Sequence, residues 1–129
     1  DAIDLEIDDE TLIGGRAKRT IRVCGPAAFV ALKANAVHIR EKLKDAYDLV
    51  YVLKHYGDEE GLGEIAGRYR GLLTERPAEV ALERLAEDFA SPDHIGSVRA
   101  ASFRTRTTDE ELQADAYGYV QEFMRLVLE

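Results

Sequence analysis

Residues 42–56 have the sequence KLKDAYDLVYVLKHY, and this stretch decides how the chain folds. Within residues 46–53, every position except Asp48 is apolar or aromatic. No glycine or proline interrupts the segment, and Gly57 follows it as a residue type that commonly ends helices. The pattern predicts a helix over residues 42–56 that is buried on most of its sides.

Two carboxylates lie on this predicted helix, Asp45 and Asp48. A spacing of three residues puts them at neighbouring positions on one helical face. Burying an ionised carboxylate without a partner costs on the order of several kcal/mol. We therefore expect both aspartates to be paired with cations, bound to a metal, or exposed to a cleft. Two close carboxylates suit either a divalent metal or a paired cation.

The preceding segment supplies cations. Lys33 lies among apolar residues, and Arg40 follows about two helical turns later. If the two predicted helices pack as a hairpin, Lys33 or Arg40 can approach the aspartates. One interpretation is a buried ion pair that ties two helices together. The competing interpretation is a functional site, because perturbed and paired charges also mark such sites. Exposure separates the two, since a site lies on an open concave face and a bridge is sealed inside.

The N-terminal region has the pattern of β-structure. Ile3, Leu5 and Ile7 alternate with acidic residues, and residues 20–24 alternate again after the turn signal at residues 14–15. The pattern predicts a β-hairpin or strand pair within residues 1–25. A lone hairpin is marginally stable, so we expect other elements to cover it.

The rest of the chain is predicted to be helical. Pro26 begins the first helix, which ends near residue 40, and Pro77 begins another. Further helices are expected over residues 59–73 and from Thr108, whose spacing to Glu111 is that of a capping box, to the C-terminus. A loop or short extended piece is expected over 93–107.

The expected fold class is α+β and mainly helical, with a small β element followed by about five helices. We expect a single domain over residues 1–129. Its expected parts are a β element (1–25), a pair of helices that carries the charged residues (26–57) and a helical remainder (58–129).

Composition narrows the class of protein. The chain has 129 residues, of which 46% are hydrophobic and 33% charged, as expected of one soluble domain. A membrane helix needs about 20 consecutive apolar residues, and no such run is present. A single cysteine, Cys24, excludes an internal disulfide framework and is expected to be a small buried hydrophobe. These features favour a cytoplasmic location and no membrane partner.

The net charge of −8 argues against broad electrostatic capture of nucleic acid. The charge is uneven, however, because residues 14–44 hold many bases and a single acid, Glu41. A local nucleic-acid patch is a weaker candidate function, and its residues would be Arg16, Lys18, Arg19 and Arg22. In the competing interpretation, the acidic strand and the basic strand simply pair with each other.

Aromatic residues accompany the aspartates. Tyr47, Tyr51 and Tyr56 lie on the same predicted helix, and their main expected role is core packing. The alternative is that one of these rings stacks on a base in a nucleotide cleft.

Several of these residues together resemble a known family. They are Ile21 to Pro26, Phe29-Val30, Leu32-Lys33-Ala34, Arg40, and Lys44 to Leu49 with Leu53. They look like the C-terminal part of the AbiEii/AbiGii-type nucleotidyltransferase family, which includes abortive-infection and toxin–antitoxin toxins on a fold related to DNA polymerase β. The resemblance is clearest over residues 20–57 and fainter over residues 76–123.

The resemblance implies roles for the charged residues. Lys33 corresponds to the family's motif lysine, which contacts nucleotide phosphates, and Asp45 and Asp48 correspond to a late paired-aspartate motif needed for activity. Arg40 and Lys44 are expected to help to bind the nucleotide. The implied cofactors are Mg²⁺ and a nucleoside triphosphate, although no metal ligand is assigned within this sequence.

The sequence also departs from the family pattern. Such enzymes begin with a Gly-Ser turn followed by a strand with paired metal-binding aspartates. No such motif precedes residue 20, and Gly96-Ser97 is late and lacks the aspartates. We therefore expect the C-terminal portion of a nucleotidyltransferase-like protein, inactive alone. Expected partners are an N-terminal catalytic part, an antitoxin or RNA acceptor, and a second copy joined through an exposed apolar face. The alternative is a non-catalytic interaction module in which the same charges form a structural bridge.

Overall fold

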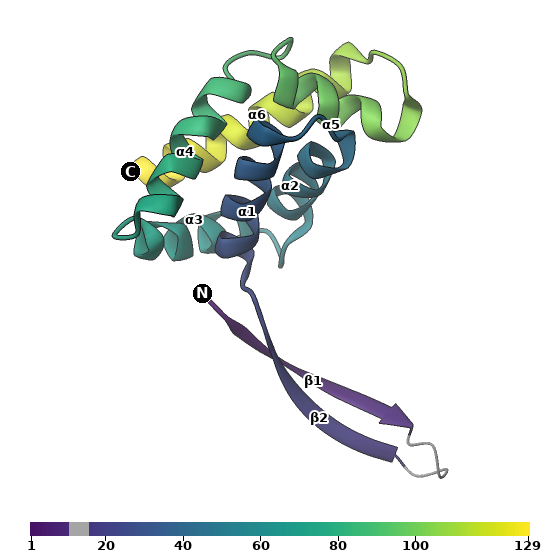
Figure 1. Cartoon of the computed structure of the whole chain (residues 1–129), viewed down its shortest axis with the longest axis vertical. Helices are drawn as coiled ribbons and strands as arrows, with labels where there is room; N and C mark the ends of the chain where they lie inside the picture. The colour runs from purple at the N-terminus through teal and green to yellow at the C-terminus, as the bar shows by residue number, and fades with distance from the viewer. Residues whose placement is uncertain (11–15) are drawn as a thin grey trace.

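The computed structural model describes the backbone of residues 1–10 and 16–129 and the side chains of residues 1–2 and 24–129. Figure 1 shows a body of packed helices from which a pair of strands extends. In the described part of the chain the helices are α1 (Pro26–Ile39), α2 (Leu43–His55), α3 (Gly61–Leu72), α4 (Arg76–Asp88), α5 (Ile95–Thr105) and α6 (Glu110–Leu128). The prediction of a mainly helical chain is confirmed, with six helices where about five were expected.

The strands β1 (Ile3–Glu10) and β2 (Arg16–Val23) pair antiparallel, with Ile3 opposite Val23 and Glu10 opposite Arg16. Three predictions concern residues outside the described part of the chain. The predicted turn at residues 14–15 lies where the backbone is not described. The predicted buried face of the strands and the predicted basic patch depend on side chains that are not described.

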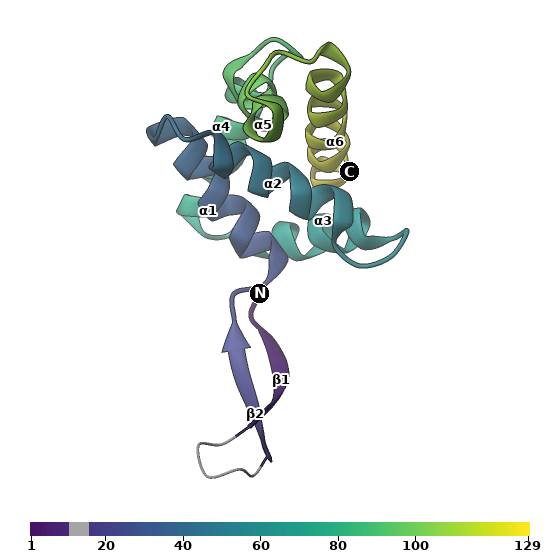
Figure 2. The ribbon, with the colours of Figure 1, turned by 90° about the vertical axis from the view of Figure 1, so that its right-hand side faces the viewer.

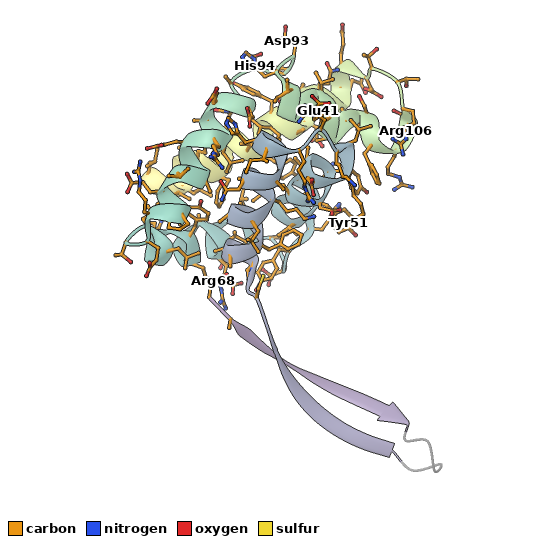
Figure 3. The ribbon with its side chains drawn as sticks, viewed as in Figure 1. Glu41, Tyr51, Arg68, Asp93, His94 and Arg106 are labelled. Carbon is orange, nitrogen blue, oxygen red and sulfur yellow. The ribbon has the colours of Figure 1, made fainter. Side chains whose placement is uncertain are left out.

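Asp1 connects the start of the chain to the helices. Its carboxylate accepts a hydrogen bond of 2.7 Å from the backbone N–H of Ala28, in the first turn of α1. Arg68 of α3 donates to the other carboxylate oxygen at 3.2 Å. Figure 3 shows Arg68 where the strands meet the helical body. A carboxylate at a helix N-terminus satisfies unpaired N–H groups and favours the helix dipole, so this contact stabilises the start of α1.

α1 begins as the sequence predicts and is apolar nearly all round. Gly25 is its N-cap residue and Pro26 occupies the first turn, where a missing N–H costs little. Its inner face buries Ala27, Val30, Ala34 and Val37. Its outer face exposes Leu32 and Ile39, each more than 60% accessible to solvent.

α2 lies at the centre of the bundle and packs against α1, α3, α5 and α6 (Figure 2). Leu49 and Leu53 are fully or almost fully buried on it. The helix ends at His55 with Tyr56 as its C-cap, and the following Gly57 has a φ of 65°, the left-handed conformation that glycine adopts without strain. The C-terminal end of this helix therefore agrees with the sequence pattern.

The prediction of a loop or extended piece over residues 93–107 is wrong, because α5 occupies most of it. Small residues explain the difference. Gly96 lies so close to the buried ring of Phe89 that a Cβ there would meet the ring Cε1 at 2.5 Å, and Ala100 and Ala101 are buried. Packing against α2 and α6 stabilises a segment whose own helix propensity is modest.

Two smaller expectations also change. α6 is capped by Asp109 rather than Thr108, because the Asp109 carboxylate accepts a hydrogen bond from the N–H of Leu112. Cys24 is exposed rather than buried, since it precedes the first helix and lies outside the core. No helix among the described residues is long and apolar enough to span a membrane.

Candidate functional site

The five charged residues singled out from the sequence meet on one side of the α1–α2 pair. We call this group the charge cluster, and its members are Lys33, Arg40, Lys44, Asp45 and Asp48. α1 supplies the first lysine, the connection over residues 40–42 supplies the arginine, and α2 supplies the rest. Because the connection is short, the end of α1 stays close to the first turn of α2, and the charges meet.

Asp45 is the buried anchor of the charge cluster. Its side chain is 4% exposed, and its Oδ1 accepts hydrogen bonds from Lys33 Nζ at 3.1 Å and from Arg40 Nη2 at 2.8 Å. Its Oδ2 is also buried and finds no hydrogen-bond partner among the described residues. Two charged donors on one buried oxygen hold the Asp45 carboxylate in a fixed orientation.

Asp48 holds the outer half of the charge cluster. Its Oδ2 lies 3.1 Å from Lys33 Nζ and 2.7 Å from Lys44 Nζ. The Lys33 ammonium therefore bridges the two aspartates, and it also lies 5.5 Å from the centroid of the Phe29 ring. Two carboxylates and an aromatic face fix the position of this ammonium more tightly than one ion pair would.

The pKa values of Lys33 and Asp48 follow from these contacts. Partial burial by itself lowers the pKa of Lys33, but the hydrogen bonds and charges of Asp45 and Asp48 outweigh it, so the pKa is raised. Burial raises the pKa of Asp48, but hydrogen bonds from Lys44 and Lys33 outweigh it, so that pKa is lowered. Both groups are therefore charged throughout the neutral range.

Exposure in the charge cluster is graded. Asp45 is sealed, the Lys33 and Asp48 side chains are 22% and 19% exposed, and Arg40 and Lys44 are more than half exposed. Oδ1 of Asp45 therefore acts as a structural bridge between Lys33 and Arg40. The ammonium of Lys33 and the two outer cations remain open to a ligand from solvent.

The charge cluster does not fit a directly bound metal ion. Three cations surround the two carboxylates, so these carboxylates have little negative charge left to offer. The free oxygen, Asp45 Oδ2, is buried, and a hydrated ion cannot reach it from solvent. Among the described residues, no group of three or more His, Cys, Asp or Glu side chains could hold a metal.

The charge cluster instead fits an anion. An ammonium has three N–H groups, and Lys33 uses two of them on aspartates; a guanidinium has five, and Arg40 Nη2 uses one on Asp45. Unused N–H groups with an excess of one positive charge are what a phosphate oxygen requires.

Arg99 supports the charge cluster from a distance and was missed by the sequence analysis. It lies on α5, and its Nη1 donates to the backbone oxygens of Val37 at 3.0 Å and Arg40 at 3.1 Å. It thus caps the C-terminal end of α1, where carbonyl groups lack partners, and holds the connection that carries Arg40. No sequence pattern pairs Arg99 with residues about sixty positions earlier.

Core packing, the main role expected of the tyrosines in residues 42–56, holds for Tyr56, the C-cap residue of α2, which is partly buried and packs against the core. Tyr51 is 50% exposed and Tyr47 is partly exposed, and neither belongs to the core. Among the residues whose side chains are described, the fully buried tyrosine is Tyr69 of α3. Figure 3 shows Tyr51 at the surface of the helical body. Tyr47 stacks on Phe103 of α5, with ring centroids 4.9 Å apart.

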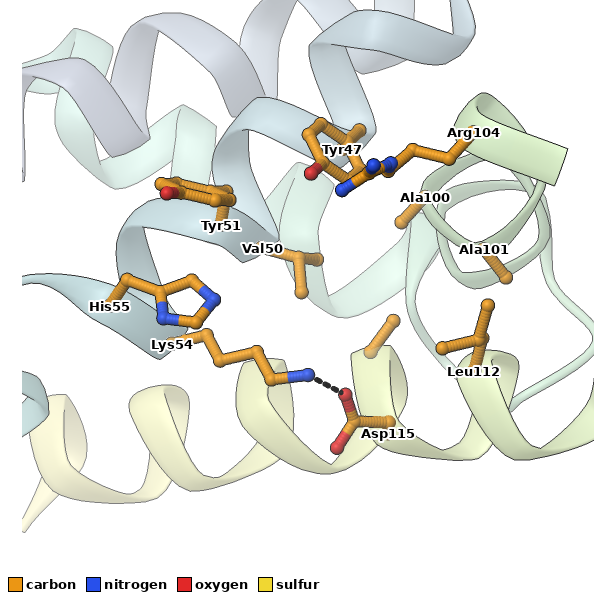
Figure 4. A pocket seen from close by; sticks show the side chains of 11 residues that line it. Tyr47, Val50, Tyr51, Lys54, His55, Ala100, Ala101, Arg104, Leu112 and Asp115 are labelled. Carbon is orange, nitrogen blue, oxygen red and sulfur yellow. Dashed lines mark hydrogen bonds and ion pairs between the residues drawn. The ribbon is translucent and has the colours of Figure 1, made fainter.

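A cavity of about 270 Å³ lies beside these tyrosines, between α2, α5 and α6 (Figure 4). The charge cluster contributes none of its lining residues. It is lined by Tyr47, Val50, Tyr51, Lys54, His55, Ala100, Ala101, Arg104, Leu112, Asp115 and Ala116. α2 thus contributes residues both to the charge cluster and to the cavity.

Comparison with known proteins identifies the family to which the chain belongs. No curated protein and no solved structure matches it. The family described as "Nucleotidyl transferase AbiEii toxin, Type IV TA system" matches residues 2–129. This match extends the resemblance from residues 20–57 to nearly the whole chain. The chain belongs to the AbiEii family of nucleotidyltransferase toxins.

Proposed function

We propose that this chain contributes the phosphate-binding side of a nucleotide cleft in a nucleotidyl transfer reaction. In this proposal Lys33 contacts the phosphates of a nucleoside triphosphate, and Arg40 and Lys44 help to bind them. Asp45 and Asp48 act as positioning residues for these cations. The observation that carries the proposal is that Lys33 Nζ is held 3.1 Å from each of two aspartates while the Lys33 side chain stays partly exposed.

The chemistry explains why a fixed cation is useful. A hydroxyl oxygen of the acceptor attacks the α-phosphorus, the bond from the α-phosphorus to the α,β-bridging oxygen breaks, and pyrophosphate leaves. The hydroxyl proton is released to solvent. Negative charge grows on the bridging oxygen and the leaving phosphates, and an ammonium that is already oriented stabilises it without reorganising.

Nucleotidyl transfer in this family implies a nucleoside triphosphate and a divalent metal, which would stabilise the negative charge that develops on the phosphates. Because the charge cluster does not fit a metal, we propose that those carboxylates lie outside it. They would belong to a catalytic part of the protein beyond residues 1–129, so that this chain alone binds the nucleotide without transferring it. The family description also supports an antitoxin as a partner, and an RNA as the acceptor is our proposal.

A second candidate is a non-catalytic helical module in which the charge cluster is only a structural bridge. The observation that favours it is the burial of Asp45, which accepts from cations of α1 and of the following connection. This candidate predicts that loss of Lys33 changes stability but no ligand contact.

Photo-crosslinking with azido-ATP and Mg²⁺ separates the two candidates. If the proposal holds, mass spectrometry of the labelled chain locates the adduct on α1 or the first turns of α2, and Lys33→Ala lowers labelling at least tenfold. Lys33→Arg retains most of it. The matched control is Arg125→Gln, which removes an exposed ion-paired cation on α6.

A transfer assay with radiolabelled triphosphates and total RNA tests the second part of the proposal. The chain alone is expected to give no labelled RNA. Labelling of RNA by the chain alone would contradict the proposal that the metal-binding carboxylates lie elsewhere. Equal crosslinking of wild type and Lys33→Ala would favour the structural bridge.

A further inference from the structure

The cavity between α2, α5 and α6 combines aromatic rings, buried apolar residues and positive charge. We propose that it binds one nucleotide unit of a single-stranded RNA, with the base against the tyrosines of α2 and the phosphate near Arg104. The inference rests on the proposed function, because it assigns this RNA as the acceptor strand. It concerns a surface that the triphosphate site does not use.

The aromatic wall comes from one stripe of α2. Tyr47 and Tyr51 have ring centroids 5.9 Å apart, and those of Tyr51 and His55 are 4.5 Å apart. The spacing of four residues stacks these rings along one side of the cavity. With half of the Tyr51 side chain exposed, a flat ring system can pack on it, and every base offers such a face.

Arg104 is the lining residue whose positive charge can contact a phosphate. Arg104 extends from α5 toward Tyr47 (Figure 4), and it forms no ion pair with any residue whose side chain is described. Lys54, by contrast, is committed to Asp115 of α6 at 2.6 Å and lies 5.7 Å from the Tyr119 ring centroid. Among the residues whose side chains are described, the lining therefore keeps one positive charge without an ion-pair partner, on a chain of net charge −8, as an anionic ligand requires.

Size and buried lining agree with a single nucleotide. A volume of about 270 Å³ is near the lower end of small-molecule sites, which run from about 300 to about 1,000 Å³. The buried lining residues of the cavity are apolar and include Val50, Ala100 and Ala116. Such a lining accepts a ring edge and has few polar groups to leave unsatisfied. An extended polyanion with many contacts would need a longer basic groove than this cavity provides.

The cavity and the charge cluster share no residue but are neighbours on α2. Lys44 and Asp48 precede Tyr47 and Tyr51 by three residues each, so they lie next to these rings on the helix surface, whereas Asp45 lies roughly 200° round the helix from Tyr47. Since the lining of the cavity includes none of the cations of the charge cluster, we expect substitutions of Tyr51 and Arg104 to affect RNA binding and to leave triphosphate binding unchanged.

The test measures RNA binding without any chemistry. Fluorescence anisotropy of fluorescein-labelled hexauridylate at about 50 mM salt, the low-salt condition that favours phosphate contacts, gives the dissociation constant of the wild-type chain. Tyr51→Ala is expected to weaken binding about tenfold, the size of one stacked base, and Tyr51→Phe, which keeps the ring, to change it less than about twofold. Arg104→Gln is expected to weaken binding and to reduce the salt slope by about one.

One control variant and one competition experiment accompany this measurement. Arg125→Gln removes one exposed positive charge far from the cavity and is expected to bind like wild type. UMP is expected to displace the labelled strand. The proposal is overturned if wild type fails to bind, if Tyr51→Ala binds like Tyr51→Phe, or if Arg104→Gln and Arg125→Gln lose binding equally.

Failure of RNA binding at the cavity can be distinguished from failure of triphosphate binding at the charge cluster. Azido-ATP labelling depends on the charge cluster, and hexauridylate binding depends on the cavity. RNA binding that responds to Tyr51 and Arg104 in a chain with no nucleotide labelling would support the cavity and contradict the triphosphate site. The reverse pattern would support the triphosphate site alone.

Discussion

Lys33 Nζ lies 3.1 Å from Oδ1 of Asp45, and the same oxygen accepts a second hydrogen bond from Arg40 at 2.8 Å. One buried carboxylate of α2 therefore holds a cation of α1 and a cation of the connection that follows it. This sharing has consequences for stability that differ from those of a simple pair, because either cation still contacts Asp45 when the other is lost.

The first prediction concerns that shared carboxylate. Lys33→Met alone and Arg40→Met alone are expected to cost little, since the remaining cation still pairs with Asp45. The double variant leaves a buried charge without a partner and is expected to lower the free energy of unfolding by about 3–5 kcal/mol. Urea unfolding of all four proteins measures the coupling. Additive, small losses would show that Asp45 does not depend on either cation.

The second prediction concerns the pH dependence of Asp48. Its pKa is lowered in the folded state, so its ionised form contributes stability that is fully present above its ordinary pKa of 3.8 and is lost as pH falls through the lower folded value. Asp48→Asn is expected to be less stable than wild type at pH 6, and the difference is expected to shrink steadily as pH falls below 3.8. Urea unfolding across this range checks it, and a constant difference would contradict it.

The third prediction concerns the arginine that caps α1. Arg99→Met keeps much of the side-chain volume and removes the donor to two backbone oxygens. Loss of this contact is expected to cost about 1–3 kcal/mol and to weaken nucleotide binding, because Arg40 loses its support. Arg76→Met, which removes an exposed pair within α4, serves as the control and is expected to cost less than about 0.5 kcal/mol.

The fourth prediction compares two helical glycines. Gly96→Ala would place a Cβ 2.5 Å from the fully buried ring of Phe89, and overpacking of this kind costs about 1–3 kcal/mol. Gly118→Ala on α6 meets nothing within 4 Å and is expected to stabilise the protein by about 0.5–1 kcal/mol through helix propensity. Thermal unfolding measures both changes, and changes of the same sign would contradict the packing at Gly96.

The sequence predicted what local rules control. Pro26 and Gly57 bound α1 and α2, and the short connection between these helices brings Lys33 to Asp45 and Asp48. The approach of Lys33 and Arg40 to the aspartates was expected from spacing and from the cost of burying charge, whereas Lys44 was assigned only from the family resemblance. The family resemblance, first evident over residues 20–57, extends through nearly the whole chain.

The sequence could not predict what depends on distant packing. α5 is helical because Gly96, Ala100 and Ala101 fit against neighbours far away in the chain. Arg99 reaches the end of α1 only in the folded protein. The exposure of Tyr51 depends on the cavity that α5 and α6 form beside it, and no periodicity within α2 encodes that cavity.

The most direct test of the central claim is titration calorimetry of this 129-residue chain with each nucleoside triphosphate and Mg²⁺. Lys33→Ala and Asp48→Asn are titrated alongside, and circular dichroism verifies that both remain folded. We predict that wild type binds at least one triphosphate and that both substitutions weaken binding at least tenfold without unfolding the chain. Absence of binding by the folded wild-type chain would contradict the account and leave the charge cluster as a structural bridge.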